Sequence, residues 1–189
     1  WIVHIRQGVH YSLNKVATAE ASRLVNGREF TGNDVAYALN LYITEPTSYI
    51  YRTFPAMRAG TANVSIAALD KWTVEIKVPV DQALNAANMF FDFSSVDLPK
   101  EVIDKYGKGA LSNWKNSVGT GAFMITDNIP GSTVTLAKNP DYWGTDPVGP
   151  GKGNKLPYVD GVEIMIIPDV STRLAALRTG KLDFVSSIS

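Results

Sequence analysis

The stretch from Ser117 to Pro147 constrains the fold most, because it combines a glycine turn, two strand segments and a tight aromatic corner. Gly119 and Gly121 permit a sharp turn at its start, since glycine adopts backbone conformations that other residues avoid. The segments 122–126 and 133–138 then flank a Pro-Gly pair, a pattern typical of a β-hairpin. The stretch carries no recognisable catalytic motif and predicts a join between two structural units.

Length and composition set the limits of what the chain can do. It has 189 residues with 45% hydrophobic content, enough for one large or two small packed domains. Lys plus Arg and Asp plus Glu number 18 each, so a neutral chain gives no electrostatic basis for binding nucleic acid. The absence of cysteine excludes a disulfide framework, a thiolate metal site and a cysteine nucleophile.

The beginning of the chain lies inside a predicted strand. Residues 1–5 alternate in polarity without any preceding turn. We therefore expect a piece of a longer protein, and the lack of a targeting signal then indicates nothing about location. No apolar run approaches the roughly 18 residues that a membrane helix needs.

The first half predicts helices and strands in alternation. Thr31 is a candidate N-cap, and Asp34 lies at the third helical position, where a carboxylate favours the positive helix end. Residues at helical spacing follow and form one apolar face: Val35, Ala38, Leu39 and Tyr42. The alternation over 72–78 predicts a strand with Trp72 in the core. Residues 98–106 predict another helix, which Gly107 stops.

The last part predicts a strand–helix–strand unit. Residues 162–167 form an apolar strand segment, and Asp169 or Ser171 can cap the helix that follows. Gly180 ends this helix, and 182–185 predict a second strand. Two strands joined by a helix in one sheet are normally parallel, so we expect a βαβ unit.

Candidate chemistry is sparse. His4 and His10 are the only histidines, and surface positions are a better interpretation for them than a metal site. The glycines and lysines of 149–155 lack the spacing of a phosphate loop. Glu163 and Asp183 lie on neighbouring predicted strands and could pair as acid and base. The simpler interpretation is that Glu163 is a solvated strand residue and that Asp183 ends a strand. We expect no cofactor and no metal.

Several ordered blocks resemble the signature of the family 5 solute-binding proteins, the extracellular peptide- and nickel-type receptors of ABC importers. The blocks are 118–123, 134–144 and 167–183, preceded by 5–9 and 30–35. The resemblance covers essentially the whole chain and departs from the family pattern between Val9 and Phe30, where a longer segment, 11–29, replaces a short turn.

The resemblance implies an α/β (α+β) chain with a partial periplasmic-binding-protein-like type II fold. Residues 1–117 would form an extra subdomain of the first lobe, and residues 118–189 part of the first-lobe α/β domain. The second lobe, which carries the acidic anchor for a peptide amine in this family, would follow this chain.

The resemblance also implies a function. The protein would be a monomeric receptor that delivers di- or oligopeptides to a membrane permease. It would be periplasmic or extracellular, with or without a lipid anchor. Two segments would face the ligand. One follows the last strand and contributes Ser186 and Ser187, and the other follows the capped helix and contributes Tyr49 and Tyr51. Other solutes remain open, namely a nickel complex, haem, a sugar or an opine, as does an enzyme domain that uses Glu163 and Asp183.

The double variant Glu163→Gln/Asp183→Asn separates a receptor from such an enzyme. In a receptor, we expect ligand affinity to stay within about 0.5 kcal/mol, because Glu163 would then be a solvated strand residue and Asp183 the end of a strand. Isothermal titration and a turnover assay on the same ligand check this. Loss of a measurable turnover by about 100-fold or more would instead support acid–base catalysis.

Overall fold

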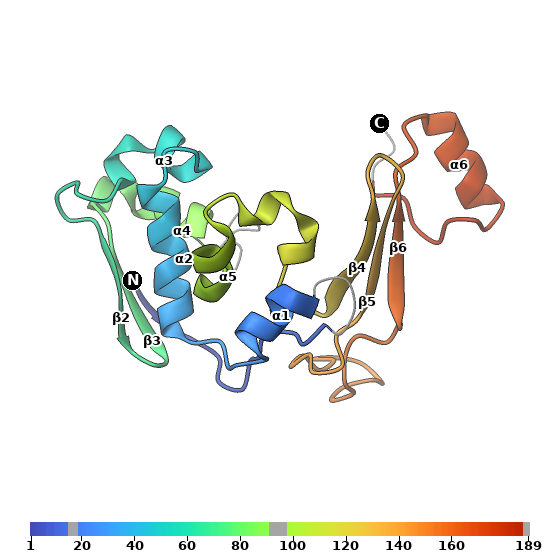
Figure 1. Cartoon of the computed structure of the whole chain (residues 1–189), viewed down its shortest axis with the longest axis horizontal. Helices are drawn as coiled ribbons and strands as arrows, with labels where there is room; N and C mark the ends of the chain where they lie inside the picture. The colour runs from blue at the N-terminus through green and yellow to red at the C-terminus, as the bar shows by residue number, and fades with distance from the viewer. Residues whose placement is uncertain (15–18, 91–97, 187–189) are drawn as a thin grey trace.

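The computed structural model describes residues 1–14, 19–90 and 98–186, and Figure 1 shows its arrangement. The described strands form two antiparallel three-stranded sheets, in the orders β1-β3-β2 and β4-β5-β6. These sheets lie at opposite ends of the long axis, with α1, α2 and α5 between them (Figure 1). None of the described helices is long and apolar enough to cross a membrane.

The elements follow the expected order with several additions. Around the first sheet lie β1 (Ile2–His4), α1 (Ala19–Val25), α2 (Gly32–Thr44), α3 (Tyr49–Thr53), η1 (Pro55–Met57), β2 (Ser65–Asp70), β3 (Thr73–Lys77), η2 (Val80–Gln82) and α4 (Ala83–Phe90). Then come α5 (Lys100–Tyr106), η3 (Ala110–Ser112), η4 (Trp114–Asn116), β4 (Phe123–Ile129), β5 (Thr133–Lys138), β6 (Gly161–Met165) and α6 (Val170–Arg178).

The start of α2 confirms the expected cap. Asp34 accepts hydrogen bonds from the main-chain amide of Thr31 at 2.9 Å and from its hydroxyl at 3.0 Å. The amide of Gly32 donates to the carbonyl of Lys71, and a Cβ at Gly32 would come within 3.2 Å of the Val74 side chain. A glycine at this position therefore lets the helix N-terminus lie directly on the turn between β2 and β3.

The first core lies between α2 and the first sheet. Val74 and Ile76 of β3 are fully buried against Ile43 of α2, as the alternation over 72–78 predicts. The expectation for Trp72 is wrong, because this residue is only half-buried. It precedes the first residue of β3, and the ammonium of Lys71 lies 4.5 Å from its ring centroid, on a surface that faces solvent.

Arg28 joins three segments that are distant in sequence. Its guanidinium donates to both carboxylate oxygens of Asp34, at 2.9 and 2.6 Å, and to both of Glu101, at 2.5 and 2.9 Å. Its central carbon lies 5.0 Å from the centroid of the Tyr11 ring, which is itself buried. Bidentate pairs of this kind fix geometry as well as charge, so Arg28 sets the position of α2 relative to α5.

The segment 11–29 is not a plain surface loop, because it contains α1 and bridges the two halves of the chain. Ser22 Oγ accepts from the amide of Asn14 and donates to the carbonyl of Ser12, each at 2.8 Å. The amide of Ser12 donates to the carbonyl of Gly119 at 2.9 Å, and Asn14 Nδ2 donates to the carbonyl of Ile125 at 3.0 Å. The longer segment therefore connects the first unit to the hairpin.

The β4–β5 hairpin is confirmed, with a bulge between Ile125 and Asp127. Asn139 ends it and is fully buried; its side-chain amide donates to the carbonyl of Gly121, and its main-chain amide donates to that of Ala122. The aromatic corner thus closes back onto the glycine turn. The boundary between residues 117 and 118 stays a prediction, since the bonds from Ser12 cross it.

The expected βαβ unit is wrong. Asp169 caps α6 as predicted, by accepting from the amide of Thr172 at 2.7 Å, but β6 runs antiparallel to β5 and 182–185 form no strand. The amides of Lys181 and Leu182 both donate to the carbonyl of Ala176 instead. These residues therefore close the end of the helix, and no described strand lies beside them to supply a ladder. Every residue of β6 is exposed.

Glu101 makes the free energy of unfolding depend on pH. Hydrogen bonds from Arg28 hold the pKa of this carboxyl below its ordinary value. A depressed folded pKa means that stability is present above the unfolded pKa of about 4.3 and is lost as pH falls through the folded pKa. We expect Glu101→Gln to lower stability by about 1 kcal/mol at pH 7, reduced from a fully buried pair by solvent screening.

Urea titrations of parent and variant at pH 7, 5 and 3.5 check this, and the difference should shrink at the lowest pH. Glu163→Gln, at an exposed carboxylate of β6, is the matched control and should change little. A Glu101→Gln difference that stays constant with pH would contradict the assignment.

Candidate functional site

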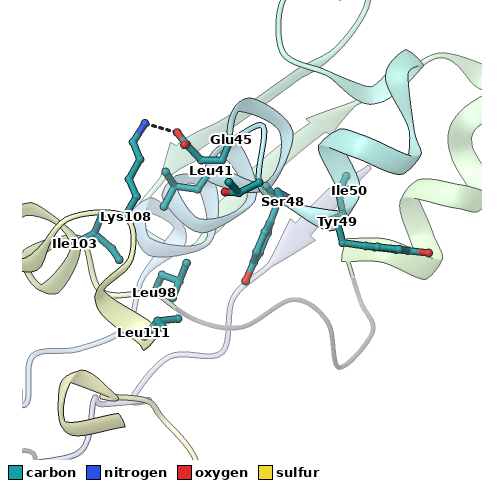
Figure 2. A pocket seen from close by; sticks show the side chains of 11 residues that line it. Leu41, Glu45, Ser48, Tyr49, Ile50, Leu98, Ile103, Lys108 and Leu111 are labelled. Atoms are coloured by element: carbon teal, nitrogen blue, oxygen red, sulfur yellow. Dashed lines mark ion pairs between the residues drawn. The ribbon is translucent and has the colours of Figure 1, made fainter. Parts of the chain in front are cut away.

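A cavity of about 200 Å³ lies where the end of α2, the start of α3 and the segment around α5 and η3 meet. Figure 2 shows Leu98 and Leu111 on one side of it and Leu41 with Ser48 on the other. These walls come from two segments that are distant in the sequence, 41–50 and 98–111. The Arg28 pairs link α2 and α5, which carry part of this lining.

The lining of the cavity is mainly apolar. Leu41 belongs to the last turns of α2, Ile50 to α3 and Ile103 to the middle of α5. Ile50, Leu98 and Ile103 are buried, whereas Leu111 in η3 is 44% exposed. A concave apolar surface of this kind with few polar groups is typical of a site for an organic ligand or part of one.

Polar side chains interrupt this lining, and three of them, Glu45, Ser48 and Lys108, bear on its chemistry. Lys108 Nζ lies 2.5 Å from Glu45 Oε1 at the rim, and its side chain is 68% exposed (Figure 2). Ser48 Oγ is buried and has no hydrogen-bond partner within the part of the chain that the structure describes. Ser48 occupies the N-cap position of α3, yet its side chain makes no cap bond. Buried polar atoms without partners are rare in proteins, so this hydroxyl needs an explanation.

The structure separates the four residues expected to bind ligand. Tyr49 lines the cavity and is 57% exposed, with its ring edge-on to Phe54 at 6.4 Å. Figure 2 shows that this ring extends away from Leu98 and Leu111. Tyr51 does not line the cavity. Its carbonyl accepts from Arg58 Nε at 2.9 Å, and the same guanidinium lies 4.4 Å from its ring centroid.

The serines lie elsewhere. Ser186 is exposed near the C-terminal end of the chain, beyond α6, while Ser187 lies outside the described residues. Figure 1 shows α3 beside the first sheet and α6, which precedes Ser186, beside the second. The roles of all four residues stay predictions. Sequence reasoning missed Ser48, because its place after Pro46 indicates an ordinary helix cap.

The other residues considered for metal binding or acid–base catalysis do not form a site in the described part of the chain. Across residues 1–14, 19–90 and 98–186, no group of three or more His, Asp or Glu side chains is placed to hold a metal ion. His10 Nδ1 lies 2.8 Å from the carbonyl of Gly27, within the bridge to Glu29. Glu163 is on β6, but Asp183 is not on a strand, so the neighbouring-strand pairing expected for them does not form.

Comparisons with known proteins agree on one group. The family model described as "Bacterial extracellular solute-binding proteins, family 5 Middle" matches residues 1–189. The heme-binding protein A of Haemophilus influenzae is 26% identical over 96% of this chain and 31% of its own length. The dipeptide-binding protein of Escherichia coli is 25% identical over 93% of this chain and 31% of its own length.

Solved structures show the same fold. The DppA protein of Helicobacter pylori in complex with the peptide STSA is 28% identical, with a TM-score of 0.64 over 96% of this chain and 33% of that one. The OppA protein of Haemophilus influenzae in complex with a peptide reaches a TM-score of 0.68 at 22% identity, over 97% of this chain and 33% of that one. The chain spans about a third of the length of these relatives and has the mixed α/β, type II fold of periplasmic binding proteins.

Ser48, whose Oγ is buried, and the fully buried Ser22 give a matched test of the unpaired hydroxyl. Ser48→Ala removes an oxygen that bonds to no described residue, so we expect the free energy of unfolding to change by less than about 0.5 kcal/mol. Ser22→Ala removes two hydrogen bonds from a fully buried site and should cost about 1–3 kcal/mol. Denaturant unfolding of both variants checks this, and a large loss in Ser48→Ala would reveal a structural partner.

Proposed function

Because the chain belongs to the bacterial extracellular solute-binding proteins of family 5, we propose that the protein containing it binds short peptides outside the membrane. The observation that carries this is the 28% identical structure from Helicobacter pylori, which holds a peptide and matches 96% of this chain. Relatives described as dipeptide- and oligopeptide-binding proteins support it. Members of the family are transport receptors, and we propose that this protein likewise catalyses no reaction.

Haem is the strongest alternative solute, since a heme-binding protein is 26% identical over nearly the same residues. The described lining favours peptide. Its polar groups are hydroxyls and the pair of Glu45 with Lys108, and the residues that line it include no His, Met or Cys. Tyr42 and Tyr49 are the lining residues of a type that can ligate a haem iron. A hydroxyl such as that of Ser48 suits the amide groups of a peptide, because it both donates and accepts.

The proposed binding cycle follows from two lobes around a cleft. Ligand enters between open lobes, a hinge closes, and the closed monomer docks on the permease of an ABC importer. In this chain, Tyr49 would contact the ligand with an exposed ring, and Tyr51 with a ring held in place by Arg58. Ser186 and Ser187 would contribute hydroxyls from the other unit. The proposed location is periplasmic or extracellular, either free or held at the membrane by a lipid anchor on a preceding segment.

Native mass spectrometry of the full-length protein as purified, before and after mild denaturation, tests the proposal. We expect release of a mixture of short peptides, because a receptor that holds main-chain groups binds many sequences. Release of haem, a metal complex or a sugar would keep the family but contradict the peptide assignment. If nothing is released, titration with a tri- and tetrapeptide mixture decides, and absence of binding there would also contradict it.

A further inference from the structure

We propose that the cavity beside Ser48 is a specificity pocket for one large, uncharged apolar side chain of the bound peptide, of leucine or phenylalanine size. The inference rests on the proposed peptide-receptor function and adds to it a named pocket and the class of side chain that it selects. It is carried by the size of the cavity, its lining, its rim and the unpaired hydroxyl in its wall.

The size of the cavity fits part of a ligand. Pockets that enclose a whole drug-sized molecule measure about 300–1,000 Å³. The volume here is about 200 Å³, whereas an engineered apolar cavity of about 150 Å³ holds a benzene molecule. The cavity is therefore too small for haem or a complete tripeptide and large enough for one phenyl or isobutyl group.

The charges at the rim argue against a charged side chain. Lys108 and Glu45 form a close ion pair there and neutralise each other. A peptide carboxylate or ammonium that entered would have to leave water for an apolar wall without a free opposite charge, which is costly. An uncharged side chain has no such cost and gains from burial against Leu41, Leu98 and Ile103.

The hydroxyl of Ser48 indicates where a polar atom of the ligand lies. Its oxygen is buried, has no partner among the described residues and does not cap α3, although the residue stands at the cap position. A partner that arrives with the peptide, such as a main-chain amide next to the inserted side chain, would satisfy it. Tyr49 and Lys108, both exposed, leave the rim accessible from solvent.

The test uses the full-length protein, freed of bound ligand by denaturation and refolding. Isothermal titration with tripeptides varied at one position at a time compares Gly, Ala, Leu, Phe and Lys. We expect Leu or Phe at one position to bind about 10- to 100-fold more tightly than Ala, as burial of a large apolar side chain predicts. Lys at that position should bind no better than Ala.

Two variants assign this preference to the cavity. Leu111→Trp places a larger side chain at the edge of the pocket and should abolish the Leu and Phe preference while the Ala peptide binds within about threefold of the parent. Ser48→Ala should weaken the Leu and Phe peptides about fivefold or more. Leu69→Trp, on an exposed position of β2 that does not line the cavity, is the matched control and should keep the preference.

The possible results separate the two proposals. Peptide binding without any preference for large apolar side chains, or a preference that both Leu111→Trp and Ser48→Ala retain, overturns the pocket and leaves the receptor function standing. If no peptide binds the parent protein, the proposed function fails and the pocket with it. If Leu111→Trp does not fold, as judged by its thermal unfolding, Ser48→Ala alone decides.

Discussion

The guanidinium of Arg28 is the contact on which the arrangement of the first unit depends. The two carboxylates that it binds both stand in the first turn of a helix, Asp34 in α2 and Glu101 in α5. Each carboxylate thus meets the positive end of its own helix as well as the cation. One side chain therefore links the N-terminal turns of two helices whose later residues line part of the cavity.

The segment 11–29, which contains Arg28, is itself held by buried polar contacts. Asn14, Ser12 and Ser22 are all buried, and their hydrogen bonds extend to the hairpin that begins the second sheet. Buried hydrogen bonds between segments distant in the sequence favour a single arrangement of the parts that they connect. The segment 11–29 therefore connects the first sheet's unit to the hairpin.

Local signals in the sequence predicted local structure well. The Thr31 and Asp34 cap, the alternation through Val74 and Ile76, and the Asp169 cap each depend on residues within one or two turns or strand positions, and the structure confirms all three. Family membership followed from ordered blocks of the same kind. The strand at 182–185 failed, because a strand needs a partner that its own residues do not specify.

The candidate site was harder to predict from the sequence for the same reason. The cavity is lined by two segments that are distant in the sequence, 41–50 and 98–111, and nothing near Ser48 indicates that its hydroxyl does not cap the helix. Tyr49 could be placed because it follows the helix that the sequence identified, but its contact with Phe54 depends on how α3 packs.

The outer edge of β6 affects how the chain behaves by itself. Val162, Ile164 and Met165 are exposed, and this edge pairs with no described strand. Residues 1–189 produced in isolation would offer that edge as a template for self-association, so aggregation of such a fragment would report an uncovered sheet and not a misfolded one.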